Sequence, residues 1–280
     1  MTETFVTSGS LRLWTERIGD PDHPAVLLIA GQAAQGYCWP DALVGRLVAS
    51  GAQVIRFDHR DTGLSSTVDF DTNPYDISEM SEDVVAILDA YRLPSAHIVG
   101  ASLGGVLAQW LGVHRPARVS SLTLLSTTPM GEDPGPPSPR FLQHLAGAAG
   151  TPHGVESDIA LFRVMNGDVR PFDEPAARAV LERCWARALD PAAAAHHGPA
   201  AWREDPNLLA PLSAITAPTL VVHGDQDPIF TVAKAEALVA AIPDARLHVV
   251  PGMGHVYFSP GLPELLADLI RRPDSPTPAG

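Results

Sequence analysis

The chain has 280 residues, a length that suits one large α/β domain carrying an inserted segment. Hydrophobic residues make up 45% of it and charged residues 18%, as in ordinary globular proteins. Its formal net charge of -13, with no cluster of Lys or Arg, argues against nucleic acid as a partner. No apolar run is long enough to span a membrane, and the polar start lacks the features of a signal peptide. We therefore expect a cytoplasmic protein with no membrane partner; the composition leaves its oligomeric state open.

Short apolar segments alternate with helical patterns along most of the chain, which predicts βαβ units and a mostly parallel sheet. The first two strands read as a hairpin turned at Ser8–Gly9, and the later ones are apolar throughout, as in a sheet covered on both faces. The predicted strands are 4–8, 11–18, 25–31, 53–57, 96–100, 121–126, 218–224 and 246–250, and the predicted helices are 39–49, 77–91, 103–114, 232–241 and 263–271.

The alternation stops between residues 129 and 212, where Pro/Gly-rich linkers separate amphipathic pieces and no convincing strand occurs. An unstructured loop of this length is improbable inside a compact domain. We therefore predict a helical cap over 129–212, inserted into a core formed by 1–128 and 213–272. The tail 273–280 is expected to be disordered.

The segment Gly100–Gly104 has the pattern G-x-S-x-G, with an apolar strand directly before it and a helical run directly after it. This context exposes a serine hydroxyl on a strained strand-to-helix turn. The amides at the start of the helix then point to where an oxyanion would form. We predict that Ser102 is a nucleophile; the other interpretation is a small residue that caps the helix.

A serine nucleophile needs a histidine base that is itself oriented by a carboxylate. Asp227 and His255 follow successive predicted strands at their carboxyl ends, the edge where open α/β sheets place their sites. The order of serine, acid and histidine along the chain fits this arrangement. Asp225 is the alternative acid, and we favour Asp227 because Asp225 looks like a turn former.

The second amide of an oxyanion hole is expected from the loop after the third strand. There Gly31 lets the backbone bend, and the amide of Gln32 is the candidate donor beside that of Leu103. A plain strand-to-helix turn is the alternative interpretation of this loop.

The segment 57–66, "FDHRDTGLSS", holds acidic and histidine side chains that could form a metal or acid/base site. We favour a structural role, in which Asp58 and Arg60 tie the loop to its neighbours through hydrogen bonds.

Several other histidines and cysteines are expected to have structural roles and no part in catalysis. His223 and His248 lie within predicted strands, so we expect them to be packed or surface residues. The pair His196–His197 resembles a metal pair but lacks supporting cysteine or carboxylate spacing, so we expect a polar turn. Cys38 and Cys184 lie far apart in sequence, follow no metal spacing and indicate no disulfide framework. We expect neither a metal nor a cofactor.

At these motifs the chain resembles the α/β-hydrolases over nearly its whole length, and more narrowly the aclacinomycin (anthracycline) methylesterases of aromatic polyketide biosynthesis. The resemblance lies in "GDPDHPAVLLIAG", "VIRFDHRDTGLSS", "HIVGASLGG" and "VVPGMGH", with "DHRDTG" in place of the more general D-x-R-G-x-G. It implies an α/β-hydrolase fold with a mostly parallel eight-stranded sheet flanked by helices. It also implies Ser102 as nucleophile, His255 as base and Asp227 as orienting acid, with the amides of Gln32 and Leu103 as the oxyanion hole.

The chain departs from that family at Ala30–Gly31, where His-Gly is common. The insertion shows no matching motif, so the identity of the substrate does not transfer. We expect a serine carboxylic-ester hydrolase for a hydrophobic small molecule, such as a methyl ester of a polyketide. Apolar side chains are expected to bind this substrate: Trp39, Met130, Phe162, Trp185, Phe230 and Tyr257, with Phe141, Met165 and Trp202 as further apolar residues of the insertion.

Other chemistries fit the same motifs. A C–C bond hydrolase or a cofactor-free perhydrolase would keep the fold and the triad. A non-hydrolytic cyclase or binding protein would keep the fold alone, and the intact triad argues against it. Haloalkane and epoxide hydrolase chemistry is disfavoured because it needs a carboxylate where Ser102 stands.

Overall fold

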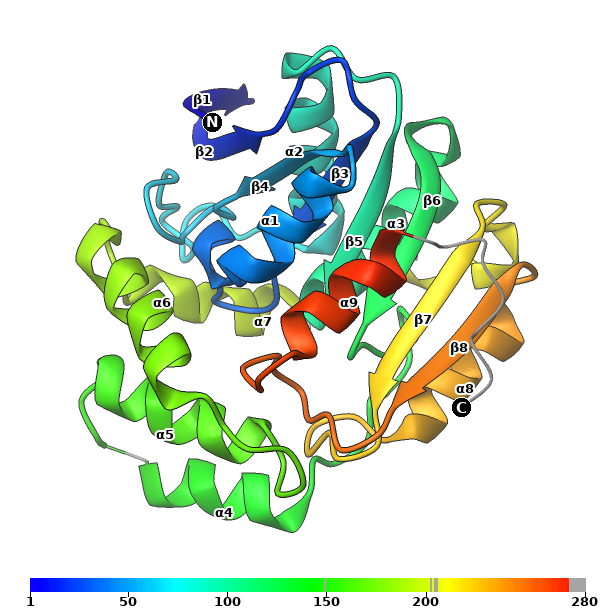
Figure 1. The fold of residues 1–280 in the computed structure, drawn as a ribbon. Helices are drawn as coiled ribbons and strands as arrows, with labels where there is room; N and C mark the ends of the chain where they lie inside the picture. The colour runs from blue at the N-terminus through cyan, green and yellow to red at the C-terminus, as the bar shows by residue number, and fades with distance from the viewer. Residues whose placement is uncertain (149, 202, 204–205, 272–280) are drawn as a thin grey trace.

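The structure is a computed structural model that describes residues 1–148, 150–201, 203 and 206–271. These residues form an eight-stranded sheet with the order β1-β2-β4-β3-β5-β6-β7-β8 (Figure 1). The hairpin β1–β2 and the β2–β4 pair are antiparallel, whereas the other neighbours are parallel, which confirms the predicted sheet. The strands are β1 (Thr2–Ser8), β2 (Leu11–Ile18), β3 (Ala25–Ile29), β4 (Gln53–Phe57), β5 (Ala96–Ala101), β6 (Val119–Leu125), β7 (Thr219–Gly224) and β8 (Ala245–Val250).

Helices cover both faces of the sheet. On one face α1 (Asp41–Ala49) and α9 (Leu262–Arg271) lie side by side (Figure 1). The other face is covered by α2 (Ile77–Ala90), α3 (Leu103–His114) and α8 (Val232–Ala241). The helix predicted from residue 39 begins at Asp41, because a residue that precedes a proline disfavours helical geometry.

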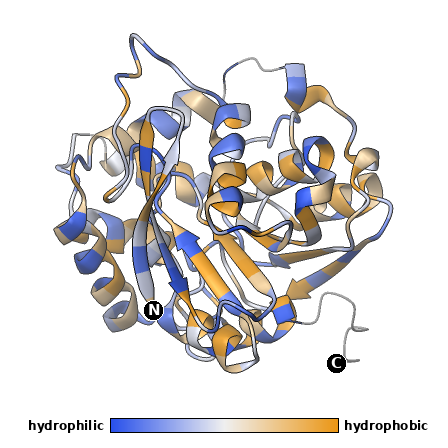
Figure 2. Ribbon diagram, turned by 90° about the horizontal axis from the view of Figure 1, so that it is seen from above, coloured by the Kyte–Doolittle hydropathy of each residue, from blue (hydrophilic) through white to orange (hydrophobic). Residues whose placement is uncertain are grey.

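Two apolar layers hold these helices to the sheet. Leu43 and Leu266 pack on the face of α1 and α9, while Leu107 and Leu238 pack on the opposite face, and all four are fully buried. Figure 2 shows hydrophobic residues along the central strands, as expected for a sheet covered on both sides.

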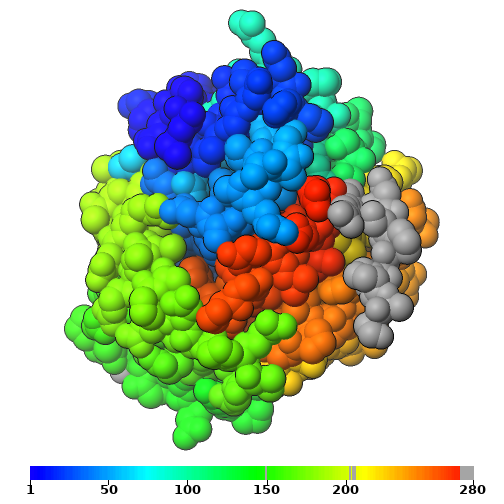
Figure 3. Space-filling view, in the orientation of Figure 1, coloured from blue at the N-terminus to red at the C-terminus, as the bar shows by residue number. Residues whose placement is uncertain are grey.

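Between β6 and β7 the chain forms α4 (Pro139–Ala148), α5 (Val155–Met165), α6 (Glu174–Arg187) and α7 (His197–Ala201). No strand occurs among the described residues of this segment. In the space-filling view the segment, coloured green to yellow-green, lies against the blue N-terminal part and near the red α9 (Figure 3). Trp202 and the tail 273–280 lie outside the described residues.

None of the helices in the described ranges combines the length and the apolar character that crossing a membrane requires.

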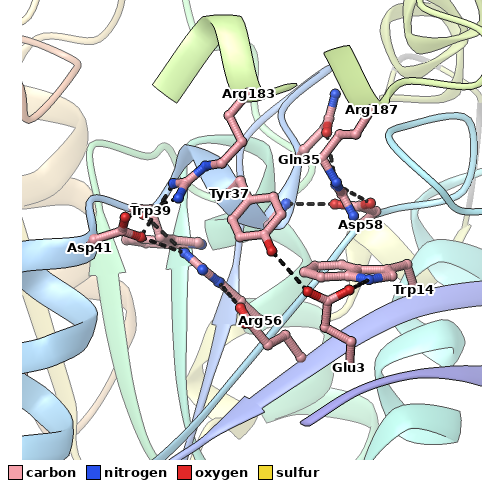
Figure 4. Close-up of polar contacts among 12 residues, drawn as sticks. Glu3, Trp14, Gln35, Tyr37, Trp39, Asp41, Arg56, Asp58, Arg183 and Arg187 are labelled. Atoms are coloured by element: carbon pink, nitrogen blue, oxygen red, sulfur yellow. Dashed lines mark hydrogen bonds and ion pairs between the residues drawn. The ribbon is translucent and has the colours of Figure 1, made fainter. Parts of the chain in front are cut away.

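Arginines of α6 dock the inserted segment onto the core through the ring of Tyr37 (Figure 4). The guanidinium carbons of Arg183 and Arg187 lie 4.2 and 4.7 Å from the ring centroid of Tyr37. Arg56 of β4 lies 4.3 Å from the same centroid and pairs with buried Glu16 at 2.7 Å. The attraction between a cation and an aromatic ring is strongest where water is excluded. This cluster therefore anchors α6 to the N-terminal part of the chain.

The loop after β4 is held by buried ion pairs. Asp58 Oδ2 lies 2.6 Å from Arg187 Nη1, and its carboxylate also accepts the amides of Gly36 and Leu64. Burial raises the pKa of Asp58, and the nearby Arg187 and the two amides offset only part of this rise. Arg60 forms a second buried pair with Asp83 of α2 at 2.7 Å. The structural role predicted for Asp58 and Arg60 is confirmed by these contacts.

Candidate active site

Ser102 occupies the sharp turn between β5 and α3. Its backbone has φ 53° and ψ -120°, a conformation that residues other than glycine rarely adopt. Its amide donates to the carbonyl of Leu125 at 2.9 Å, and its carbonyl accepts the Thr127 hydroxyl at 2.7 Å. The neighbouring strand β6 therefore holds the turn in place. The Ser102 side chain makes no capping hydrogen bond to α3, which argues against the interpretation of a helix cap.

Two glycines allow the backbones around this turn to approach closely. A Cβ atom at Gly100 would lie 2.1 Å from the carbonyl oxygen of Gly104, and one at Gly104 would lie 2.3 Å from that of Ile29. A third glycine, Gly31, places the loop after β3 beside the serine, since its Cβ would lie 3.3 Å from the Cβ of Ser102. Side chains at these positions would push β3, β5 and α3 apart.

Asp227 and His255 meet at the carboxyl ends of β7 and β8. Asp227 Oδ2 lies 2.8 Å from His255 Nδ1, while Oδ1 accepts the amides of Ile229 and Phe230. Burial raises the pKa of Asp227, but the attraction and hydrogen bonding of His255 outweigh it and hold this pKa below its usual value. The carboxylate is therefore ionised at neutral pH and holds the histidine ring.

The neighbouring polar residues have other partners. Asp225 Oδ1 accepts the amide of Gly252 at 2.7 Å and so ties the loop after β7 to the loop after β8. His223 is fully buried in β7, with Nε2 2.9 Å from the carbonyl oxygen of Phe230 and 3.5 Å from Asp227 Oδ2. His223 is packed, as expected, but its contact with Asp227 was not predicted; their spacing of four residues was the one signal in the sequence.

Ser102 and His255 both line a cavity of about 900 Å³ at this edge of the sheet. Of the residues expected to bind substrate, five line the cavity: Trp39, Phe162, Trp185, Phe230 and Tyr257. Phe141 and Met165 line it as well.

The expectation that Met130 binds substrate was wrong. This residue packs in the apolar core on the side of α3 and does not line the cavity. Its amide donates to the side chain of Gln109 at 2.8 Å, and this bond draws the chain after β6 over α3.

The wall of the cavity also holds polar groups that the sequence did not place there. Asp158 of α5 accepts the indole N–H of Trp185 at 2.7 Å, and burial raises the pKa of this carboxyl. Cys38 and Cys184 line the same wall with their sulfurs 3.8 Å apart, although 146 residues separate them. No local pattern marks such a contact between the core and α6.

The loop 30–33 runs past Ser102 towards the inserted segment. Neither the amide of Gln32 nor that of Leu103 has an acceptor within the described part of the chain. His59 Nε2 lies 3.0 Å from the carbonyl oxygen of Ala30, and His197 Nδ1 lies 3.0 Å from the amide nitrogen of Ala33.

The polar turn expected at His196–His197 was wrong for His197, which is fully buried and packs edge-on against the ring of His59. His196 Nδ1 lies 3.0 Å from Oδ2 of Asp61, a residue that lines the cavity. Across the described ranges, no group of three or more His, Cys, Asp or Glu side chains is placed to hold a metal ion.

Comparisons with known proteins agree with this architecture. A family model described as alpha/beta hydrolase fold matches residues 24–261. Rhodomycin D methylesterase DauP of Streptomyces sp. (strain C5) is 35% identical, over 91% of this chain and 92% of its own length. Rhodomycin D methylesterase DnrP of Streptomyces peucetius is 34% identical over the same shares. The crystal structure of a hydrolase from Pseudomonas aeruginosa superposes with a TM-score of 0.74 at 26% identity, covering 96% of each chain.

A Gly104→Ala substitution tests the close backbone approach at the serine turn. Because the added Cβ would meet a backbone oxygen that has no room to move, we expect the free energy of unfolding to fall by about 1–3 kcal/mol. Gly45→Ala in α1 is the matched control, since nothing lies within 4 Å of its Cβ and alanine favours helix by about 1 kcal/mol. Urea unfolding of both variants measures the difference, and equal effects would contradict the account.

Proposed function

Because the chain belongs to the alpha/beta hydrolase family, we propose that it is a serine carboxylic-ester hydrolase of the methylesterase type. The observation that carries the proposal is the hydrogen bond between His255 and ionised Asp227 at the rim of a cavity that Ser102 also lines. These are the three groups that nucleophilic ester hydrolysis requires.

In the proposed mechanism the Ser102 oxygen attacks the ester carbonyl while His255 Nε2 accepts the hydroxyl proton. Asp227 accepts the N–H at His255 Nδ1, which leaves the lone pair of the ring on Nε2. His255 then gives the proton to the departing alcohol, and an acyl-enzyme ester remains on Ser102. Water, deprotonated by His255, attacks this ester; as the bond between the acyl carbon and the Ser102 oxygen breaks, His255 returns the proton to that oxygen and the carboxylic acid leaves.

The oxyanion of the tetrahedral intermediate is assigned to the amides of Gln32 and Leu103. Both lack a protein acceptor in the described residues, and Gly31 lets the loop pass close to Ser102. Leu103 is the first residue of α3, where the helix dipole adds positive potential. In enzymes of known mechanism, one such donor contributes about 10²- to 10³-fold to the rate.

The proposed substrate is a methyl ester of a hydrophobic, polycyclic acid such as an aromatic polyketide. A cavity of about 900 Å³ lined by aromatic residues of both core and insertion supports this class. The similarity to two rhodomycin D methylesterases supports the same class. We propose that the segment 129–212 is a cap that roofs this cavity, since α5 and α6 contribute Phe162 and Trp185 to its wall.

Replacing the nucleophile tests the proposal directly. We expect Ser102→Ala to lower kcat for aromatic methyl esters by about 10⁴-fold or more, because no other group can carry the acyl intermediate. Release of acid from a panel of methyl esters and β-diketones, followed by chromatography, measures this loss and separates ester from C–C cleavage. Ser10→Ala, at an exposed serine in the hairpin turn, is the control and should be unaffected. Full activity of the Ser102 variant would refute the mechanism.

The two acids after β7 make a second, sharper test. We expect Asp227→Asn to lower kcat by about 10⁴-fold, because the amide cannot hold the productive tautomer of His255. Asp225→Asn should lower kcat by less than about tenfold, since that side chain ties two loops together through the amide of Gly252 and does not contact His255. The reverse order of the two effects in steady-state kinetics would assign the acid to Asp225.

A further inference from the structure

We propose that His197, the first residue of α7, is a positioning residue that holds the loop 30–33 so that the Gln32 amide faces the reacting carbonyl oxygen. The inference rests on the proposed function, because it assigns a role within the same site. It also gives the inserted segment a part in the reaction, since His197 reaches the core from that segment.

The loop is held at both ends by buried histidines. His59 Nε2 donates to the carbonyl of Ala30 at 3.0 Å, and the Ala33 amide donates to His197 Nδ1 at 3.0 Å. Gln32 lies between these two points of attachment. The direction of its amide therefore depends on both contacts, and no other side-chain acceptor for the Ala33 amide occurs in the described residues.

The loop needs this support because its backbone is strained. The Ala34 amide donates to the carbonyl of Gly31 at 3.2 Å, which closes a four-residue turn with Gln32 and Ala33 at its centre. Ala33 has φ 58° while Gln32 has a negative φ, the pattern of a type II turn, which normally needs glycine at the third position. The bond to His197 holds the central peptide in the orientation that Ala33 alone disfavours. Without it, we expect the central peptide to flip and the loop to shift against Ser102.

The second contact of the ring fixes which nitrogen accepts. His197 Nε2 lies 2.8 Å from the carbonyl oxygen of Arg60, which can only accept, so Nε2 carries the hydrogen. Nδ1 is then left with the lone pair that the Ala33 amide requires. Burial and the neighbouring His59 lower the pKa of His197 to about 4, so the ring is neutral at pH 7.

Two amide substitutions separate the two contacts of the ring. His197→Asn places an acceptor oxygen where Nδ1 stands and loses the bond to Arg60, whereas His197→Gln keeps a donor near Nε2 and loses the bond to Ala33. We expect His197→Gln to lower kcat by about 10- to 100-fold with KM changed less than about threefold, because the loop acts on the transition state. His197→Asn is expected to restore most of that loss. His248→Gln, on half-buried β8, is the matched control for a remote histidine.

Equal losses in the two variants, or wild-type kcat in His197→Gln, would overturn the assignment. Ser102→Ala is measured in the same assay. If wild type and Ser102→Ala are equally inactive, the proposed function fails, and the role of His197 is then tested by a measurement on the wild-type protein that needs no activity.

For that case, and for variants too unstable to purify, ¹⁵N-histidine NMR of the wild type supplies a second measurement. We expect His197 to show the Nε2–H tautomer from pH 8 to 5.5, with Nδ1 as a hydrogen-bonded acceptor. An Nδ1–H tautomer, or a ring that titrates near pH 6.5, would contradict the proposal.

Discussion

The close approach of three backbones at Gly100 and Gly104 is the constraint on which the rest of the site depends. It lets β5 run into α3 without a loop, so Ser102 is forced into a strained conformation at the wall of the cavity. The strain is held by Leu125 at the end of the neighbouring strand β6 and by Thr127 just after it. Parallel pairing then brings the ends of β7 and β8, with Asp227 and His255, to the same edge.

Two buried carboxylates show how the surroundings decide the charge of an acid. Asp58 binds Arg187 and two amides, yet burial dominates and its pKa is raised. Asp227 is buried as deeply, but His255, His223 and the backbone amides around it overcome that penalty, and its pKa is lowered. The first carboxylate docks the inserted segment onto the core, and the second holds a histidine ring. In both, one partner comes from far away in the sequence: Arg187 for Asp58 and His255 for Asp227.

Much of the fold could be predicted because strand and helix periodicities are local properties. The apolar runs marked the eight strands, and the motif around Ser102 marked the family that the family model confirms. Met130 was misplaced because the bond between its amide and Gln109 redirects the chain after β6, and no local pattern records that contact. The burial of His197 and the meeting of Cys38 with Cys184 depend on how the inserted helices dock. That docking is fixed by ion pairs and by contacts of arginines with an aromatic ring across more than 100 residues of chain, which periodicity does not encode.

We propose that the turn at Ser102 exposes a serine that His255 activates. Intact-mass spectrometry after treatment with a fluorophosphonate tests it most directly, since only an activated serine reacts with this reagent. We expect one adduct per chain on the wild type and none on Ser102→Ala or His255→Ala. An unmodified wild type, or an adduct that survives the loss of Ser102, would contradict it.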